Sequence, residues 1–341
     1  MDRFGTPMNL LEQQGSNRRR TWLVMAMFVA FLALLGFGFD VFYLESGGTP
    51  FPVGTLVALG IGSVSAFAGY YRGDKAVLGS SGAIPLEEAM TAASSDAERL
   101  ELRQLENVVD EMAIASGLPR PGIFVVPDPD PNAFATGRDP AHASIAVTRG
   151  LLDRLTREQL QGVIAHEMSH VRNYDIRLMT VVAALVGAVV LLADWASRSM
   201  RFGGGGRGRR RNGKSSGAIG LVFLAVWLVA IILAPFIAQL LATMVSRRRE
   251  YLADATGAEL TRNPLALAGA LAAIESANEP TQAIKRGSAH LCIADPLGRA
   301  VGLKEGFVAD LLATHPPMTK RIDALREMAF QSAGPSQSSR A

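Results

Sequence analysis

His166-Glu167-Met168-Ser169-His170, preceded by the apolar residues Val163-Ile164-Ala165, is the most informative stretch of this sequence. In a helix of about 3.6 residues per turn, His166 and His170 lie one above the other on the same face. Both imidazoles can then bind one metal ion, and Glu167 beside them can take a proton from the water that the ion activates. This is the H-E-x-x-H pattern of zinc hydrolases, and it predicts a metal site in preference to a pair of hydrogen-bonded structural histidines.

A catalytic zinc ion needs a third protein ligand and an open position for water. The single cysteine, Cys292, excludes a cysteine-based zinc site, and its sequence context favours a packed side chain over a nucleophile. Glu250 is the best candidate for the third ligand. Asp254 lies one turn further on, where it can hydrogen-bond a liganding histidine and fix its tautomer. The spacing is equally compatible with a charged helix end whose residues pair with one another.

The composition points to a membrane. Hydrophobic residues make up 49% of the 341 residues, and the mean hydropathy of +0.20 excludes a disordered chain. The excess lies in four runs: Trp22–Phe39, Val53–Tyr71, Leu178–Ala193 and Ala218–Val245. A spanning helix needs roughly 17–25 apolar residues, so the first, second and fourth runs are long enough and the third is marginal.

The first two runs are expected to form a helical hairpin instead of a cleaved signal peptide. The first run is too long for a signal peptide and has no small-residue cleavage site. In the second run, Ala58, Gly62 and Ala66 recur every fourth residue, a spacing that lets two membrane helices approach closely.

Basic residues orient this hairpin. Arg18, Arg19 and Arg20 precede it, Arg72 and Lys75 follow it, and the turn between its helices has no Lys or Arg. The positive-inside rule therefore places both ends of the hairpin in the cytoplasm.

The second hairpin has a basic connection that opposes this rule. Residues 198–217 hold seven basic and no acidic residues: Arg198, Arg201, Arg207, Arg209, Arg210, Arg211 and Lys214. Either the first hairpin dominates the orientation, or the second enters the bilayer only partly. We interpret the Gly/Arg-rich loop as a flexible linker beside anionic lipid headgroups, not as an RGG-like nucleic-acid segment, and expect no nucleic-acid partner.

The region between the hairpins has the composition of a soluble α/β segment. Ser94 or Ser95 is expected to cap a helix that ends at Ser116, and Thr156 with Gln159 forms a capping box for the H-E-x-x-H helix. Three strands are expected, at Gly122–Val126, Asn132–Thr136 and Ala143–Val147.

We therefore predict an α-helical membrane protein with an α+β catalytic domain and about four transmembrane or membrane-associated helices. Its predicted segments are a cytoplasmic N-terminus (1–20), a transmembrane hairpin (21–72), the first catalytic part (73–175), the second hairpin (176–246), the second catalytic part (247–330) and a disordered tail (331–341).

Several separate motifs resemble, in their order, those of the HtpX family. They are the first hairpin, Asn132–Gly137, His166–His170, the second hairpin, Arg249–Asp254 and His315-Pro316-Pro317, and they cover Arg20 to Met328. The HtpX family consists of bacterial membrane zinc metallopeptidases related to the type I CAAX prenyl proteases. The resemblance implies a zincin-like (gluzincin) catalytic domain.

The resemblance also implies roles for individual residues. His166, His170 and Glu250 would bind one Zn²⁺ per chain, and Glu167 would be the general base. The pair Asn132-Ala133 would hold the substrate backbone as an added strand. His315 would either stabilise the oxyanion or cap the last helix.

Family membership further implies a multi-pass protein of the bacterial inner membrane. It would cut membrane or unfolded proteins on the cytoplasmic side, in protein quality control. Three alternatives stay open: a non-proteolytic membrane scaffold, a lipid- or nucleic-acid-binding protein that acts through the Gly/Arg-rich loop, and a processing protease for one specific peptide.

Overall fold

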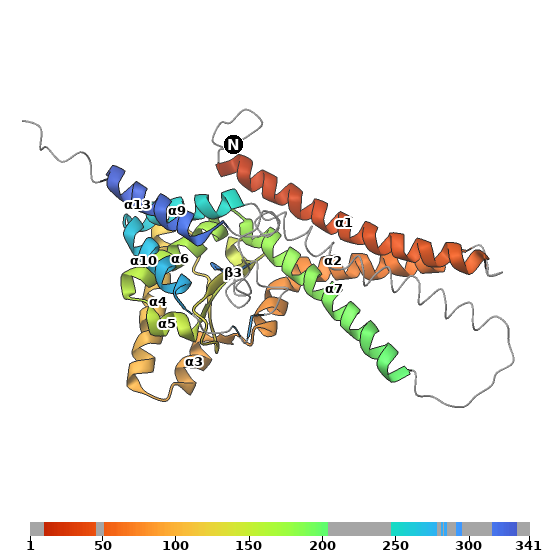
Figure 1. The fold of residues 1–341 in the computed structure, drawn as a ribbon, viewed down its shortest axis with the longest axis horizontal. Coiled ribbons are helices and arrows are strands. Elements are labelled where there is room, and N and C mark those ends of the chain that lie inside the picture. The colour runs from red at the N-terminus through yellow and green to blue at the C-terminus, as the bar shows by residue number, and fades with distance from the viewer. Residues whose placement is uncertain are drawn as a thin grey trace, which may run out of the picture.

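A computed structural model of the protein describes residues 10–45, 51–203, 247–277, 281, 283–284, 291–294 and 316–332. Two long helices, α1 (Leu10–Glu45) and α2 (Val53–Ser80), lie side by side and project from a mixed α/β domain (Figure 1). Helix α7 (Asp175–Gly203) leaves the domain beside them.

Among the described residues, two helices have the length and apolar composition of membrane spans, at Gln14–Val41 and Val53–Ser80. Only 22% and 17% of their most apolar windows are buried within the protein, whereas the core helix of a soluble protein is mostly buried. The third predicted run lies within α7. The fourth run and most of the Gly/Arg-rich loop, residues 204–217, lie outside the described residues.

The predicted small-residue face of α2 lies against α1. Gly62 and Ala66 are buried, and a Cβ atom added at Gly36 of α1 would lie 2.8 Å from the Cβ of Ala58. Asp40, the one charge that interrupts the first apolar run, closes the far end of the hairpin. Its carboxylate accepts hydrogen bonds from the N–H groups of Gly54 and Thr55, both at 2.7 Å, and so caps α2.

Helix α1 begins at Leu10, well before the apolar run that starts at Trp22. The additional turns dock on the α/β domain. Gln14 donates a hydrogen bond to the carbonyl of Arg172 at 2.9 Å, and Thr21 is fully buried. The segment predicted as a cytoplasmic N-terminus thus contributes to the contact between the hairpin and the domain.

The sheet contains four strands in the order β1-β2-β4-β3: β1 (Ile84–Pro85), β2 (Gly122–Val126), β4 (Ala143–Thr148) and β3 (Ala133–Gly137). Strands β2 and β4 are parallel, and β3 pairs with β4 in antiparallel orientation, with Ala133 opposite Val147. The three strands expected from the sequence are present within one residue at each end. Strand β3 lies at one edge of the sheet and β1 at the other.

Seven further α-helices and the short 3-10 helix Pro140–His142 complete the described domain; the α-helices are α3 (Leu86–Ala92), α4 (Asp96–Ser116), α5 (Arg149–Arg154), α6 (Arg157–Arg172), α9 (Arg247–Thr261), α10 (Pro264–Glu275) and α13 (Met318–Ser332). The hydroxyl of Ser95 accepts the Glu98 N–H and caps α4. Both hydrogen bonds of the predicted Thr156–Gln159 capping box are present at the start of α6. Sequence-local signals thus set both helix starts.

Helix α6 lies at the centre of the domain, in contact with α4, α9, α10 and β3. Most of its residues from Leu160 to Val171 are buried. After α6, Tyr174 adopts a left-handed conformation (φ 59°), which is uncommon for a residue other than glycine. This turn lets α7 start next to the end of α6, so that Asp175 lies beside His170.

Candidate metal centre

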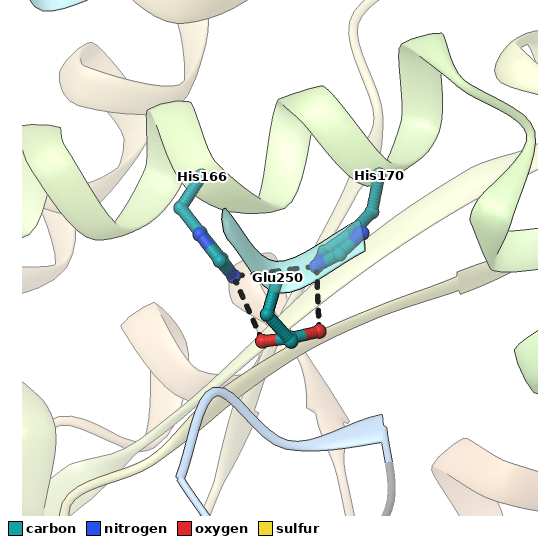
Figure 2. Close-up of side chains that lie close together, drawn as sticks. All are labelled: His166, His170 and Glu250. Carbon is teal, nitrogen blue, oxygen red and sulfur yellow. Dashed lines mark hydrogen bonds and ion pairs between the residues drawn. The ribbon is translucent and has the colours of Figure 1, made fainter. Parts of the chain in front are cut away.

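Helices α6 and α9 bring two imidazoles and one carboxylate together (Figure 2). The Nε2 atoms of His166 and His170 lie 3.2 Å apart. Glu250 lies across from them, with Oε2 3.8 Å from His166 Nε2 and Oε1 3.6 Å from His170 Nε2. All three side chains are buried, so the carboxylate predicted as third ligand does meet the two histidines.

The approach of α9 to α6 depends on Gly257. A Cβ atom at this position would lie 3.0 Å from the backbone nitrogen of His166 and 3.2 Å from its Cα. The absence of a side chain therefore lets α9 lie close to the turn of α6 that carries His166. That close packing places Glu250 on the same side as both histidines.

Each histidine has a carboxylate on its other ring nitrogen. Nδ1 of His166 lies 3.0 Å from Oδ1 of Asp254, and Nδ1 of His170 lies 3.2 Å from Oδ2 of Asp175. A proton held on Nδ1 by the carboxylate leaves the Nε2 lone pair free for a metal ion. The sequence pointed to Asp254 in this role, but Asp175 was missed.

These residues fit a zinc ion. Bonds of about 2.0–2.2 Å at tetrahedral angles separate ligand atoms by about 3.3–3.6 Å. The separations of 3.2, 3.6 and 3.8 Å are close to that range. Two imidazoles and one carboxylate are also a donor set that is typical of catalytic zinc, with a fourth position left for water.

Arg321, on α13, is fully buried next to the ligands. Its Nη1 lies 3.4 Å from Oε2 of Glu250 and donates to the carbonyl of Ile293 at 2.7 Å. Sequence reasoning missed this residue as well. The signal was a lone arginine on the apolar face of the last helix, one residue before Ile322 and four before Leu325.

Glu167 is buried beside the two histidines, and neither of its carboxylate oxygens makes a hydrogen bond of normal geometry with the described residues. Burial raises the pKa of Glu167 to about 7, and the charge of Glu250 adds to this rise while that of His170 opposes it. The Ala135 N–H also favours the ionised form. A carboxyl group with a pKa near neutrality suits a general base.

The two histidines differ electrostatically in the metal-free protein. Burial lowers the pKa of His166, and Asp254 only partly opposes this effect. Burial also acts to lower the pKa of His170, but the hydrogen bond to Asp175 and the charges of Glu250, Asp175 and Glu167 outweigh it and raise the pKa to about 9. A metal ion must therefore displace a proton from His170 at neutral pH.

The segment 291–294 lies along the first part of the β3 edge. The N–H of Ile293 donates to the carbonyl of Ala133 at 2.9 Å. The buried Asn132 side chain donates to the carbonyl of Ala294 at 3.0 Å. In this structure, therefore, the two residues predicted to hold substrate contact a segment of the chain itself.

Ala135 is the next residue of β3 whose backbone groups point away from β4, because alternate residues of an antiparallel strand do so. Its N–H acts on the carboxylate of Glu167 as a backbone hydrogen-bond donor, and an antiparallel bridge joins the preceding residue, Phe134, to Cys292. Beyond it, the Gly137 N–H donates to Thr180 at 2.9 Å. The edge of β3 next to Glu167 is therefore covered in this structure, with Ala135 only 2% exposed. His315, predicted to act on the oxyanion or as a helix cap, lies outside the described residues.

Comparisons with known proteins agree with this chemistry. Residues 99–329 match the family described as peptidase family M48. The chain is 41% identical over 324 residues to a "Protease HtpX homolog" of Caldanaerobacter subterraneus subsp. tengcongensis, covering 95% of this chain and 99% of that protein. It is 43% identical over 319 residues to one of Thermoanaerobacter pseudethanolicus, covering 94% and 98%. A crystal structure of Ste24p from S. mikatae has a TM-score of 0.46 and 16% identity, over 92% of this chain and 67% of that one.

Proposed function

The chain belongs to peptidase family M48 as a homologue of the HtpX proteases, and from this premise we propose that it is a membrane-bound zinc endopeptidase. Its substrates would be unfolded or membrane-inserted proteins, cut at the cytoplasmic face of a bacterial inner membrane in protein quality control. The observation that carries the proposal is the buried arrangement of His166, His170 and Glu250, each histidine held by a carboxylate, with Glu167 beside them.

His166, His170 and Glu250 would hold one Zn²⁺ per chain. When bound, zinc polarises a scissile carbonyl and makes water a stronger acid. Asp254, 3.0 Å from Nδ1 of His166, and Asp175, 3.2 Å from Nδ1 of His170, would favour a proton on each Nδ1 and so keep both Nε2 atoms directed at the same point. This second layer of carboxylates makes the ligands more basic and fixes their orientation.

Glu167 would move the protons of the reaction. With its pKa near 7, its carboxylate can accept a proton from water at neutral pH and give that proton to the leaving amine. Its oxygens make no hydrogen bond of normal geometry with the described residues, and the Ala135 N–H is the smallest of the influences on its pKa, so the carboxylate is available to accept a proton.

The edge of β3 would hold the substrate as an extended strand. The N–H and carbonyl of Ala135 would bind one substrate residue in the manner of an added strand, in place of the segment 291–294 that lies along this edge. A compact folded protein does not present such a free segment, whereas an unfolded one does. This favours unfolded substrates over folded ones.

The apolar hairpin would anchor the domain in the bilayer. Most residues of the α1 and α2 spans are not buried by other parts of the protein. Arg18–Arg20 and Arg72 lie toward the end of the hairpin that joins the domain. The positive-inside rule then gives the metal centre a cytoplasmic position.

Zinc content and proteolysis of the full-length protein in detergent would test the proposal. Wild type, Glu167→Gln and Glu158→Gln are compared with casein as an unfolded substrate and a tightly folded domain as a control substrate. Glu158 is exposed on the same helix, so its variant is a matched control. We expect one zinc per chain in all three proteins, and a loss of casein cleavage of about 10²- to 10⁴-fold in Glu167→Gln alone.

A folded wild-type protein without zinc would contradict the proposal, as would equal turnover of Glu167→Gln and wild type. Zinc binding without any cleavage in wild type would favour the scaffold alternative. Cleavage of the folded domain as fast as casein would contradict the proposed substrate class.

A further inference from the structure

Helix α1 contacts a residue that lies directly beside the metal centre. The side-chain nitrogen of Asn17 donates to Oδ1 of Asp175 at 2.7 Å. The other carboxylate oxygen of Asp175 lies 3.2 Å from Nδ1 of His170. A continuous line of polar contacts thus joins the first membrane helix to a metal ligand.

All members of this line are protected from water. Asn17 and Asp175 are 2% and 0% exposed, and His170 is buried as well. A hydrogen bond to a buried carboxylate is charge-assisted and stronger than a neutral one. Loss of the donor would leave a buried charge with fewer partners, which is costly.

Asp175 contacts residues of three other helices: α1 of the hairpin, and α6 and α9, which carry the proposed metal ligands. It receives Asn17 from α1, faces His170 of α6, and lies 3.2 Å from Nη1 of Arg249, the residue before Glu250 on α9. Its orientation therefore bears on both helices that carry metal ligands. Asn17 also donates to the carbonyl of Asn173 at 2.9 Å, which fixes the turn that leads to Asp175.

We propose that Asn17 is a positioning residue by which the first membrane helix holds Asp175, and through it His170, in the geometry that binds the metal. Docking of α1 against the domain then raises the zinc affinity of the site, and withdrawal of α1 lowers it. The proposal rests on the zinc site of the proposed function and adds a contribution of the membrane hairpin to that site.

A neighbouring residue provides the control. Gln14 lies three residues earlier on the same helix and donates to the carbonyl of Arg172 at 2.9 Å. It makes the same kind of contact between α1 and the end of α6, and no hydrogen bond between it and Asp175 is found in the described part of the chain. A role of Asn17 that is limited to docking α1 would give Asn17 and Gln14 variants similar properties.

The test measures the zinc affinity of full-length protein in lipid nanodiscs, by competition with a chromogenic chelator. Wild type, Asn17→Leu, Gln14→Leu, Asp175→Asn and the double variant Asn17→Leu/Asp175→Asn are compared. The visible spectrum of the cobalt(II)-substituted proteins reports the ligand geometry independently. Neither readout depends on peptidase activity.

We expect Asp175→Asn to weaken zinc binding by roughly 10- to 100-fold, as for other residues that orient a ligand, and Asn17→Leu by about three- to tenfold. Gln14→Leu should change the affinity less than about twofold. In the Asp175→Asn background, Asn17→Leu should add little, because the two residues act through one contact. Should Asn17→Leu fail to fold, Asn17→Ser, which is too short to reach Asp175, gives the same comparison.

Equal zinc affinities and cobalt spectra for wild type and the Asn17 variants would overturn this inference while leaving the proposed function intact. Equal losses for Asn17→Leu and Gln14→Leu would also overturn it, because they would show a docking role only. A wild-type protein that binds no zinc would instead overturn the proposed function, and this inference with it.

Discussion

The Arg321 guanidinium donates to both carboxylate oxygens of Asp254, from Nε at 2.8 Å and from Nη2 at 2.7 Å. The neighbouring charge of Arg321 keeps the pKa of Asp254 low in spite of burial, which by itself would raise it. Asp254 in turn holds Nδ1 of His166. One buried arginine from the last described helix thus stabilises the carboxylate beside His166, a proposed metal ligand.

Replacement of Arg321 by methionine should destabilise the protein by about 3–5 kcal/mol, because Asp254 would remain as a buried charge without its main partner. Zinc affinity should fall as well, since an unrestrained Asp254 no longer fixes His166. Thermal unfolding and chelator competition measure the two effects. Arg326→Met is the matched control, because Arg326 is exposed on the same helix; a similar loss in both variants would contradict the role of Arg321.

Zinc binding should depend on pH through His170. In the metal-free protein, this side chain keeps its proton up to its pKa of about 9, so zinc must displace the proton at lower pH. Apparent zinc affinity should therefore rise about tenfold per pH unit between pH 7 and 9, and level off above. Calorimetry at pH 7.5 in buffers of different ionisation enthalpy measures the protons released. Release of no proton would contradict this prediction.

The same group affects the stability of the metal-free protein. Because folding raises the pKa of His170 above its value in the unfolded chain, this group adds stability that is fully present below about pH 6.5. The contribution is lost as the pH rises through about 9. Metal-free wild type should thus lose stability toward pH 9 relative to His170→Gln. Parallel pH profiles for the two proteins would show that the environment of His170 does not favour its charged form.

Parts of this architecture were predictable because they depend on local sequence. The capping box of α6, the cap of α4 at Ser95 and the three strands each involve residues that are close in the chain. The two histidines of the candidate metal site were predictable for a different reason, since His166 and His170 lie one helical turn apart. The position of Glu250 depends on the close packing of α9 against α6 at Gly257. The spacing of residues along the chain does not predict that packing.

The missed residues depend on packing between distant segments. Arg321 and Asp254 are separated by 67 positions, and Asn17 and Asp175 by 158. Asp175 is only five residues from His170, but its contact requires the left-handed turn at Tyr174, a conformation that tyrosine rarely adopts. Asn132 shows the same limit: its segment forms a strand edge as expected, and a segment of the chain more than 150 positions away lies against its side chain.

The stability of the membrane hairpin should depend on Asp40, even though this charge interrupts an apolar run. Asp40→Leu lengthens the apolar run but removes the cap of α2, so we expect the hairpin to lose about 1–2 kcal/mol of stability. Thermal unfolding in detergent measures this loss, and Val41→Leu is the control because it changes the neighbouring residue without affecting the cap. An unchanged or higher stability of Asp40→Leu would contradict the capping role.

The backbone of Ala135 should be essential for substrate binding if the edge of β3 holds the peptide. Ala135→Pro removes its N–H and keeps the small, apolar side chain, so kcat/KM for a peptide substrate should fall by at least about tenfold, the equivalent of one lost hydrogen bond. Zinc content should stay at the wild-type value. A substrate in which an ester replaces the amide that donates to the Ala135 carbonyl tests the other backbone group without altering the protein. If kcat/KM is unchanged for both the variant and the ester substrate, the peptide does not bind at this edge, and a different surface near Glu167 must hold it.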